Sequence, residues 1–309
     1  MNDATILQKC KSVNRFSIII YFSLTVFAAP LQSQQNTFLQ EFQSMNLPVA
    51  TGKITVYYAS GYEKRAADVR PLVEEAMEFY ESNLNVKQEF SAAILTRDQW
   101  TKHIQGIPYG LPFVSDNIAV LPATNDGVIT AGAIAMKPNV SATTLKKIKQ
   151  SGYDYETGAM KFNDLIALHE LGHVYTSAYG IKSPTKWFHE FLAQYFVHAF
   201  LEEKHPKLAD FFQAMAMNVY LEGLQHPQYT SLEDFERLYS GVGADNYAWY
   251  QGKFLQKAAQ IYNAKKLKFF ADVKRAFLLD EKGEVTQEVA LERLEKISPG
   301  ITAWTKSFI

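Results

Sequence analysis

Residues 168–180 read LHELGHVYTSAYG and place two histidines four residues apart, with a glutamate directly after the first. In an α-helix each residue turns by about 100° and rises by about 1.5 Å. His169 and His173 are then about 40° apart around the axis, so both imidazoles can reach one ion. Glu170 points to one side, where it can approach a metal-bound water. The spacing predicts two metal ligands and a general base. The alternative is a helix with two surface histidines and a solvated glutamate.

A third ligand is expected on the next helix. A catalytic zinc ion usually takes three protein ligands and leaves one position for water. The third ligand could be a histidine six residues after His173 or an aspartate nearby. Position 179 is tyrosine, however, and no aspartate lies in that neighbourhood. Glu190 follows 17 residues after His173 in KWFHEFLAQYF, beyond a short link that contains Gly and Pro. A second helix that folds back beside the first would bring Glu190 to the pair. We therefore expect His169, His173 and Glu190 to bind one Zn²⁺ per chain.

Composition limits the remaining choices. The chain has 309 residues, of which 47% are apolar and 20% are charged, an ordinary globular balance. Its formal net charge of -1 gives no electrostatic reason to expect nucleic acid as a partner. Cys10 is the only cysteine, so thiolates cannot complete a metal site in the body of the chain. Ligands must therefore be His, Asp or Glu.

The first 29 residues differ from the rest. Three basic residues precede an apolar run over 16–29, and a polar stretch follows. This pattern is typical of a secretory signal peptide, with Val26 and Ala28 at the −3 and −1 positions of a cleavage site. It predicts a protein exported to the periplasm or the extracellular space, without stable membrane insertion after cleavage. An uncleaved N-terminal membrane anchor and a buried N-terminal helix are the alternatives.

The rest of the chain, 30–309, is expected to form one unit with an α/β part over about 50–160 and a helical part over 161–309. The metal site would lie at their junction. Strands are expected at 53–60, 90–96, 117–122 and 132–137, and helices at 63–84 and 97–104. Asn163 or Asp164 is the expected N-cap of the helix that carries the first motif, and Ser183-Pro184 is expected to open the next. The strand NIAVLP (117–122) is either an edge strand that pairs with an extended peptide or an ordinary core strand.

A family resemblance follows from these motifs. HELGH followed by W-x-x-E-x-x-A-x-Y resembles the gluzincin metallopeptidases, the group that includes thermolysin-like and aminopeptidase-N-like catalytic domains. The matching residues are His169, Glu170, His173, Trp187, Glu190, Ala193 and Tyr195. The resemblance implies an α+β, zincin-like fold and a zinc-dependent enzyme that hydrolyses peptide bonds in peptide or protein substrates. Glu170 would take a proton from the attacking water. Phe191 stands where the group commonly has Gly, and no signature that holds a free amino terminus is present, which favours an endopeptidase or an unusual specificity.

Further site residues are suggested with less specific signals. In the family a tyrosine or histidine from the helical part often hydrogen-bonds the developing oxyanion, and Tyr247 or Tyr250 would supply it here; core packing is the alternative. Gln194, four residues after Glu190, would accept a hydrogen bond from a ligand imidazole or belong to a polar rim. His189 and His198 are expected to be packing or surface residues.

Two other functions remain open from the sequence. One is a catalytically inactive, metallopeptidase-like module that binds a partner in the cell envelope. The other is a surface-binding protein that holds no metal.

Overall fold

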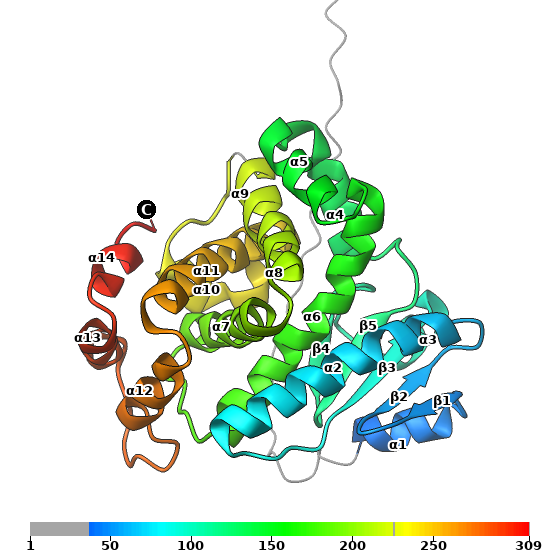
Figure 1. The fold of residues 1–309 in the computed structure, drawn as a ribbon, viewed down its shortest axis with the longest axis horizontal. Coiled ribbons are helices and arrows are strands. Elements are labelled where there is room, and N and C mark those ends of the chain that lie inside the picture. Colours follow the sequence, from blue (N-terminus) through cyan, green and yellow to red (C-terminus); the bar gives the residue numbers. More distant parts are fainter. Residues whose placement is uncertain (1–36, 225, 309) are drawn as a thin grey trace, which may run out of the picture.

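The computed structural model describes residues 37–224 and 226–308, so the predicted signal peptide lies outside the described residues. The described chain is α+β, with a small mixed sheet on one side and a larger group of helices on the other (Figure 1). In these two ranges no helix combines the length and the apolar character needed to cross a membrane.

The sheet has five strands in the order β1-β2-β3-β5-β4. Their bounds are β1 Val49–Thr51, β2 Thr55–Tyr58, β3 Ser91–Leu95, β4 Phe113–Ser115 and β5 Ile118–Pro122. The three inner strands run parallel, and the two edge strands, β1 and β4, are antiparallel to their neighbours. The expected strand 117–122 is therefore present as β5, and of its two alternatives, edge strand or core strand, the structure confirms the core strand. It pairs on both sides, and β4 is the edge strand.

Both faces of the sheet are buried. Ala92 and Ile94 of β3 belong to the large core beneath the helices, whereas Ala93 and Leu95 belong to a smaller cluster with Trp100. Successive side chains of a strand point to opposite faces, so this alternation places apolar groups against two layers at once. A strand buried on both faces shows a continuous apolar run, which explains why the four residues that follow Ser91 in β3 are all apolar and buried.

The first half of the chain also contains α1 Thr37–Ser44, α2 Glu63–Leu84, α3 Arg97–His103, α4 Val128–Met136 and α5 Ala142–Gln150. The bounds of α2 are those predicted from its apolar stripe. Thr96 and Gln99 form a reciprocal capping box at the start of α3. The strand predicted at 132–137 is wrong, because these residues lie in α4 and the 3-10 turn Lys137–Asn139 that follows it.

The two motif helices are α6 Tyr155–Ala178 and α7 Lys186–Lys204. The predicted start of α6 at Asn163 or Asp164 is wrong, since the helix begins two turns earlier, after Asp154. Its end near Gly180 is confirmed. Helix α7 begins two residues later than predicted, because the Thr185 side chain, not that of Ser183, accepts a hydrogen bond from the N–H of Phe188.

The chain then continues in helices that pack around α7. They are α8 Pro206–Gln213, a π-helix Ala214–Val219, α9 Tyr220–Gly223, α10 Leu232–Leu238, α11 Ala244–Lys265, α12 Lys268–Ala276, α13 Gln287–Ile297 and α14 Ile301–Thr305. Ser231 caps α10 by accepting a hydrogen bond from the N–H of Asp234. Figure 1 shows α7 between α6 and α11, near the centre of the molecule.

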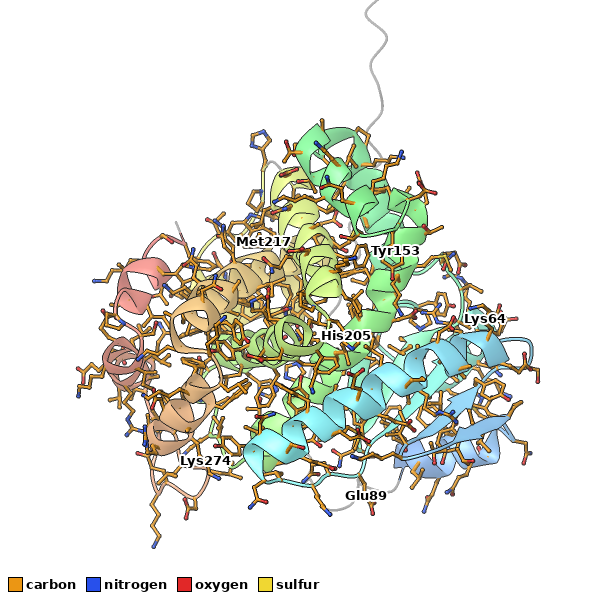
Figure 2. All side chains as sticks on the ribbon, in the orientation of Figure 1. Lys64, Glu89, Tyr153, His205, Met217 and Lys274 are labelled. Carbon is orange, nitrogen blue, oxygen red and sulfur yellow. The ribbon has the colours of Figure 1, made fainter. Side chains whose placement is uncertain are left out.

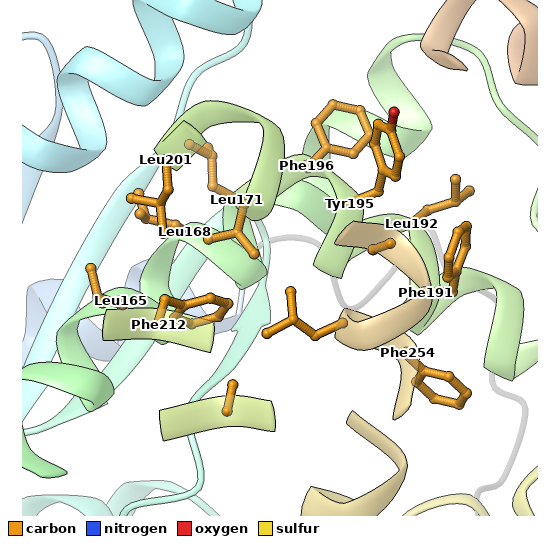
Figure 3. Close-up of a cluster of buried hydrophobic side chains, with 14 of the residues drawn as sticks. Leu165, Leu168, Leu171, Phe191, Leu192, Tyr195, Phe196, Leu201, Phe212 and Phe254 are labelled. Atoms are coloured by element: carbon orange, nitrogen blue, oxygen red, sulfur yellow. The ribbon is translucent and has the colours of Figure 1, made fainter. Parts of the chain in front are cut away.

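One large core joins the sheet to the C-terminal helices. Figure 3 shows part of it, where side chains from α6, α7, α8 and α11 meet; the labelled residues are Leu165, Leu168, Leu171, Phe191, Leu192, Tyr195, Phe196, Leu201, Phe212 and Phe254. The far end of α7 is also tied to α2, because His205 lies 2.8 Å from Glu75. Figure 2 places His205 near the middle of the molecule. Helix α7 is thus fixed along its whole length.

Candidate metal centre

Three potential ligand atoms converge between α6 and α7. The Nε2 atoms of His169 and His173 are 3.1 Å apart, and the Oε2 atom of Glu190 lies 3.1 Å from the first and 3.6 Å from the second. In the described chain, these residues form the one group of three or more His, Cys, Asp and Glu side chains close enough to hold a metal ion. The structure thus brings together the three residues expected from the sequence.

These distances fit a zinc ion. Three atoms that each lie about 2.0–2.1 Å from a tetrahedral ion are about 3.3–3.4 Å from one another. The three observed separations bracket that value. The donor set of two imidazoles and one carboxylate is also one that binds zinc in proteins. For both Nε2 atoms to offer a lone pair, the protons of the neutral rings must sit on Nδ1, and both Nδ1 atoms are buried without a hydrogen-bond partner among the described residues.

A glycine within the motif allows the two helices to approach. A Cβ atom at Gly172 would lie 3.0 Å from the carbonyl oxygen of Ala193 and 3.1 Å from Cβ of Phe196. Glycine therefore permits this contact without a shift, whereas a larger residue would require the neighbouring helix to move by a few tenths of an ångström. Because Ala193 is three residues after Glu190, the contact at Gly172 sets the height at which Glu190 faces the two histidines.

Burial and the interaction between Glu190 and His173 act in opposite directions on the pKa of each of these two groups. Burial alone would raise the pKa of Glu190, yet the two imidazoles beside it hold that pKa well below its usual range. Burial lowers the pKa of His173, although the carboxylate of Glu190 opposes this shift. The centre therefore favours an ionised carboxylate and a neutral His173 ring, which are the forms that coordinate a cation.

Glu170 lies beside the three ligands and faces the edge strand. Burial, and then the negative charge of Glu190, raise the pKa of its carboxyl group well above the usual value, while a hydrogen bond from the backbone N–H of Val114 in β4 opposes this. A carboxyl group with a raised pKa is matched to proton transfer near neutral pH. Glu170 thus lies beside the candidate ligands, as expected from the sequence, and its role as a general base stays a prediction.

Two residues that the sequence did not indicate hold Glu190 in place. The hydroxyl of Tyr239 donates a hydrogen bond to Oε1 of Glu190, and the amide nitrogen of Gln251 donates to Oε2 at 2.7 Å. Gln251 lies four residues after Tyr247 on α11, so helical spacing from that candidate could have found it. Tyr239 follows the last residue of α10, and no spacing pattern marks it.

Of the two tyrosines suggested as oxyanion donors, one lies near the candidate metal centre and the other does not. Tyr247 lies near the centre: burial raises its pKa, and the charge of Glu190 and the neighbouring Tyr239 raise it further. Tyr250 is directed elsewhere, because its hydroxyl donates to the backbone oxygen of Ser231 at 2.7 Å. The amide nitrogen of Gln194 donates a hydrogen bond to Oε1 of Gln251 at 2.7 Å.

The predicted bond from a ligand imidazole to Gln194 is wrong, since the side-chain oxygen of Gln194 has no hydrogen-bond partner in the described chain. Gln194 instead contacts Gln251, which in turn donates a hydrogen bond to Glu190.

A cleft of about 460 Å³ opens beside His173. It is lined by the end of β4 and its turn, by one face of α6 and by α7; the residues are Gln88, Val114, Ser115, Asp116, Asn117, His173, Val174, Ser177, Ala178 and His189. The His189 ring stacks on that of His173, with centroids 4.2 Å apart, and burial lowers its pKa to about 4. His189 therefore packs, as expected, but against a ligand rather than in the core. His198 is buried in the core.

Phe191 points away from the metal centre. Its ring is fully buried and stacks with Phe188, and its edge meets Phe269 of α12. The departure from Gly at this position thus serves the packing of α7 against the C-terminal helices. No protein-family model, curated protein or solved structure matches this chain. The chemistry of the centre is therefore inferred from its own geometry.

Proposed function

We propose that the chain is a zinc-dependent metallopeptidase of the gluzincin type, with a zincin-like catalytic fold. One observation supports this most strongly: Nε2 of His169, Nε2 of His173 and Oε2 of Glu190 converge within 3.1–3.6 Å, with the buried carboxyl group of Glu170 next to them. Two ligands and a base from one helix, with a third ligand from the next, are the parts that zinc-assisted peptide hydrolysis needs.

Each residue has a distinct task in this proposal. Zinc, when bound, supplies a Lewis acid that lowers the pKa of a coordinated water to about 7. Glu170 accepts a proton from the attacking water and delivers it to the leaving nitrogen, so one carboxyl group serves as base and then as acid. The Tyr247 hydroxyl remains protonated, because burial raises its pKa, and it is therefore a hydrogen-bond donor. A donor is what a developing oxyanion requires.

The edge strand β4 is the proposed docking site for an extended peptide. It is an outer strand of the sheet, and the backbone N–H of its residue Val114 lies close enough to the Glu170 carboxyl group to oppose the rise in its pKa. Val114 and Ser115 also line the cleft that reaches His173. A peptide that adds to the open side of this strand would pass the candidate base and ligands. Its side chains would enter a cleft that contains both polar and apolar groups.

Export is part of the proposal and is supported by the sequence of the first 29 residues alone. The charged flank, the short apolar run and the small residues at Val26 and Ala28 match a cleavable signal. The mass of the N-terminal peptide of the protein recovered from its native cell tests this. A chain that begins near Ala29 or Pro30 supports cleavage, and an intact N-terminus contradicts it.

The catalytic proposal is tested with two measurements on the purified chain. Zinc content is expected at one equivalent, and cleavage of a mixed peptide library is expected to fall by at least 100-fold in Glu170→Gln, because general acid–base catalysis contributes about 10²–10⁴-fold. The variant should keep its zinc, since Glu170 is not a ligand. Absence of stoichiometric zinc in the wild type, or equal cleavage by the two proteins, would refute the proposal.

A further inference from the structure

Helix α10 is hydrogen-bonded to the first turn of α7, the turn that precedes Glu190. The carboxylate of Glu236 accepts hydrogen bonds from the backbone N–H groups of Lys186, at 3.0 Å, and Trp187, at 2.8 Å. These groups have no partner within their own helix, and a carboxylate is favoured at the positive end of the helix dipole. The start of α7 and the end of α10 thus form one joined unit.

A second hydrogen bond joins the end of α10 to Glu190, the proposed metal ligand. Three residues after Glu236, the Tyr239 hydroxyl donates to Oε1 of Glu190. Glu190 is 1% exposed, so this phenol takes the place of a water molecule on that oxygen. The other oxygen, Oε2, is the one that faces the two imidazoles.

The orientation of the Gln251 amide is determined by the carboxylate of Glu190. The ionised carboxylate of Glu190 can only accept, so the NH₂ group of Gln251 must face it, 2.7 Å from Oε2, and the Gln251 oxygen then accepts from the amide nitrogen of Gln194 at 2.7 Å. Gln194 belongs to α7 and Gln251 to α11. The glutamate is therefore held by donors from two separate segments, the end of α10 and the middle of α11.

The backbone of Tyr239 is strained. Its φ is 51° and its ψ is -120°, a region that bulky residues rarely adopt. Such a conformation costs on the order of 1–3 kcal/mol and persists only where the surroundings enforce it. The Tyr239 ring is enclosed by the rings of Phe235 and Tyr247 and by the ammonium group of Lys186. The strain aims the phenol at Glu190.

We propose that Tyr239 and Gln251 are positioning residues that make Glu190 a one-oxygen metal ligand. Tyr239 occupies Oε1, so Oε2 alone is offered toward His169 and His173, and Gln251 fixes the direction of that oxygen. This inference rests on the proposed metal site. It adds that the end of α10, which supplies no ligand, governs how tightly the metal is held.

The test compares Tyr239→Phe with Tyr250→Phe. Both substitutions remove one partly buried hydroxyl that donates a hydrogen bond, and both rings pack against Phe235. Tyr250 donates to the backbone oxygen of Ser231 and not to Glu190, so it is a matched control. The zinc dissociation constant is measured by competition with a chromophoric chelator, and the visible absorption of the Co²⁺-substituted proteins reports ligand number.

Tyr239→Phe is expected to raise the zinc dissociation constant by about 10–100-fold, the usual effect of losing a group that orients a ligand. Its cobalt spectrum should weaken, because Glu190 can then bind through both oxygens and raise the coordination number. Tyr250→Phe should leave both readouts unchanged while lowering the melting temperature. Gln251→Met should act in the same direction as Tyr239→Phe and provides a second variant.

The outcomes separate the two proposals. A wild-type protein that binds neither zinc nor cobalt would refute the proposed function. A wild type that binds zinc, together with a Tyr239→Phe variant of equal affinity and spectrum, would overturn this inference alone. Equal weakening in Tyr250→Phe would also overturn it, because the effect would then come from general packing.

Discussion

A methyl group on Gly172 would lie 3.0 Å from the carbonyl oxygen of Ala193, so the helix that carries two of the candidate ligands touches the helix that carries the third, backbone to backbone. Gly172→Ala must move one helix by a few tenths of an ångström. Such overpacking costs about 1–3 kcal/mol, more than the about 1 kcal/mol that alanine gains over glycine inside a helix. We expect lower stability in urea unfolding and weaker zinc binding in a chelator competition.

Gly158→Ala is the control for that experiment. It lies on the same helix, and its added Cβ would be 3.1 Å from a ring carbon of Phe211 rather than from backbone. A side chain can yield, so zinc affinity should not change. Equal zinc affinity in Gly172→Ala and the wild type would show that the close helix contact does not set the ligand geometry.

Zinc should stabilise the folded chain through its three ligands. A ligand at 100 times its dissociation constant stabilises the folded state by about 2.7 kcal/mol. Scanning calorimetry with and without zinc is expected to show a higher melting temperature for the wild type. Alanine at His169, at His173 or at Glu190 should abolish the shift. His205→Ala is the control, since His205 pairs with Glu75 outside the centre. A shift that survives in all three ligand variants would contradict the assignment.

His198 makes the fold sensitive to acid. Burial, with a further contribution from Lys266, lowers its pKa to about 4, against about 6.5 in an unfolded chain. Between these values the unfolded state binds the extra proton, so this group lowers stability as the pH falls from 6.5 toward 4 and has no such effect above 6.5. The full effect is about 3 kcal/mol.

His198→Phe removes this proton and keeps a ring against Tyr262. Urea unfolding at a series of pH values should show a shallower loss of stability below pH 6.5 than in the wild type. Identical pH slopes for the two proteins would contradict the burial of a neutral imidazole at this position.

The cleft beside His173 can be blocked without touching a ligand. Ser177 is exposed and lines the cleft, one helical turn beyond the ligand. Ser177→Trp should reduce peptide cleavage by raising KM, while zinc content stays at one equivalent. Thr143→Trp, at an exposed position on α5, is the control and should change neither quantity. Unchanged KM in Ser177→Trp would exclude this cleft as the path of the substrate.

The convergence of the three candidate ligands could be predicted from the sequence because they are close in the chain and lie on regular helices. His169, Glu170 and His173 depend only on helical geometry, and Glu190 requires one short link between two helices. The strands β2, β3 and β5 were predicted for a similar reason, since each is a short run of apolar or β-branched residues bounded by turns.

What the sequence missed depends on tertiary contacts. The run GAIAMK is apolar in either structure, and packing of α4 against α6 selects the helix. The edge strand β4 is only three residues long and lies among turn residues. The position of Tyr239 could not be predicted, because its backbone has a positive φ and the residue is not the glycine that usually marks such a conformation.

The tyrosine candidates show the limit of periodicity. Tyr247 and Tyr250 are both aromatic residues of α11, but three residues of helix turn them about 60° apart. One consequently faces the metal centre and the other faces Ser231. Only the rotation of α11 about its axis, set by its packing on α7, distinguishes them.

The link between α6 and α7 consists of residues 179–185, so all three candidate ligands come from 22 consecutive positions, 169–190. Closing so short a loop costs little chain entropy. Contacts between near neighbours also form faster than the parallel pairings of β2 with β3 and of β3 with β5, which join residues 36 and 27 positions apart. A folding chain would thus form the helix pair that carries the candidate ligands before these parallel pairings, and zinc in the refolding buffer should speed the recovery of native structure.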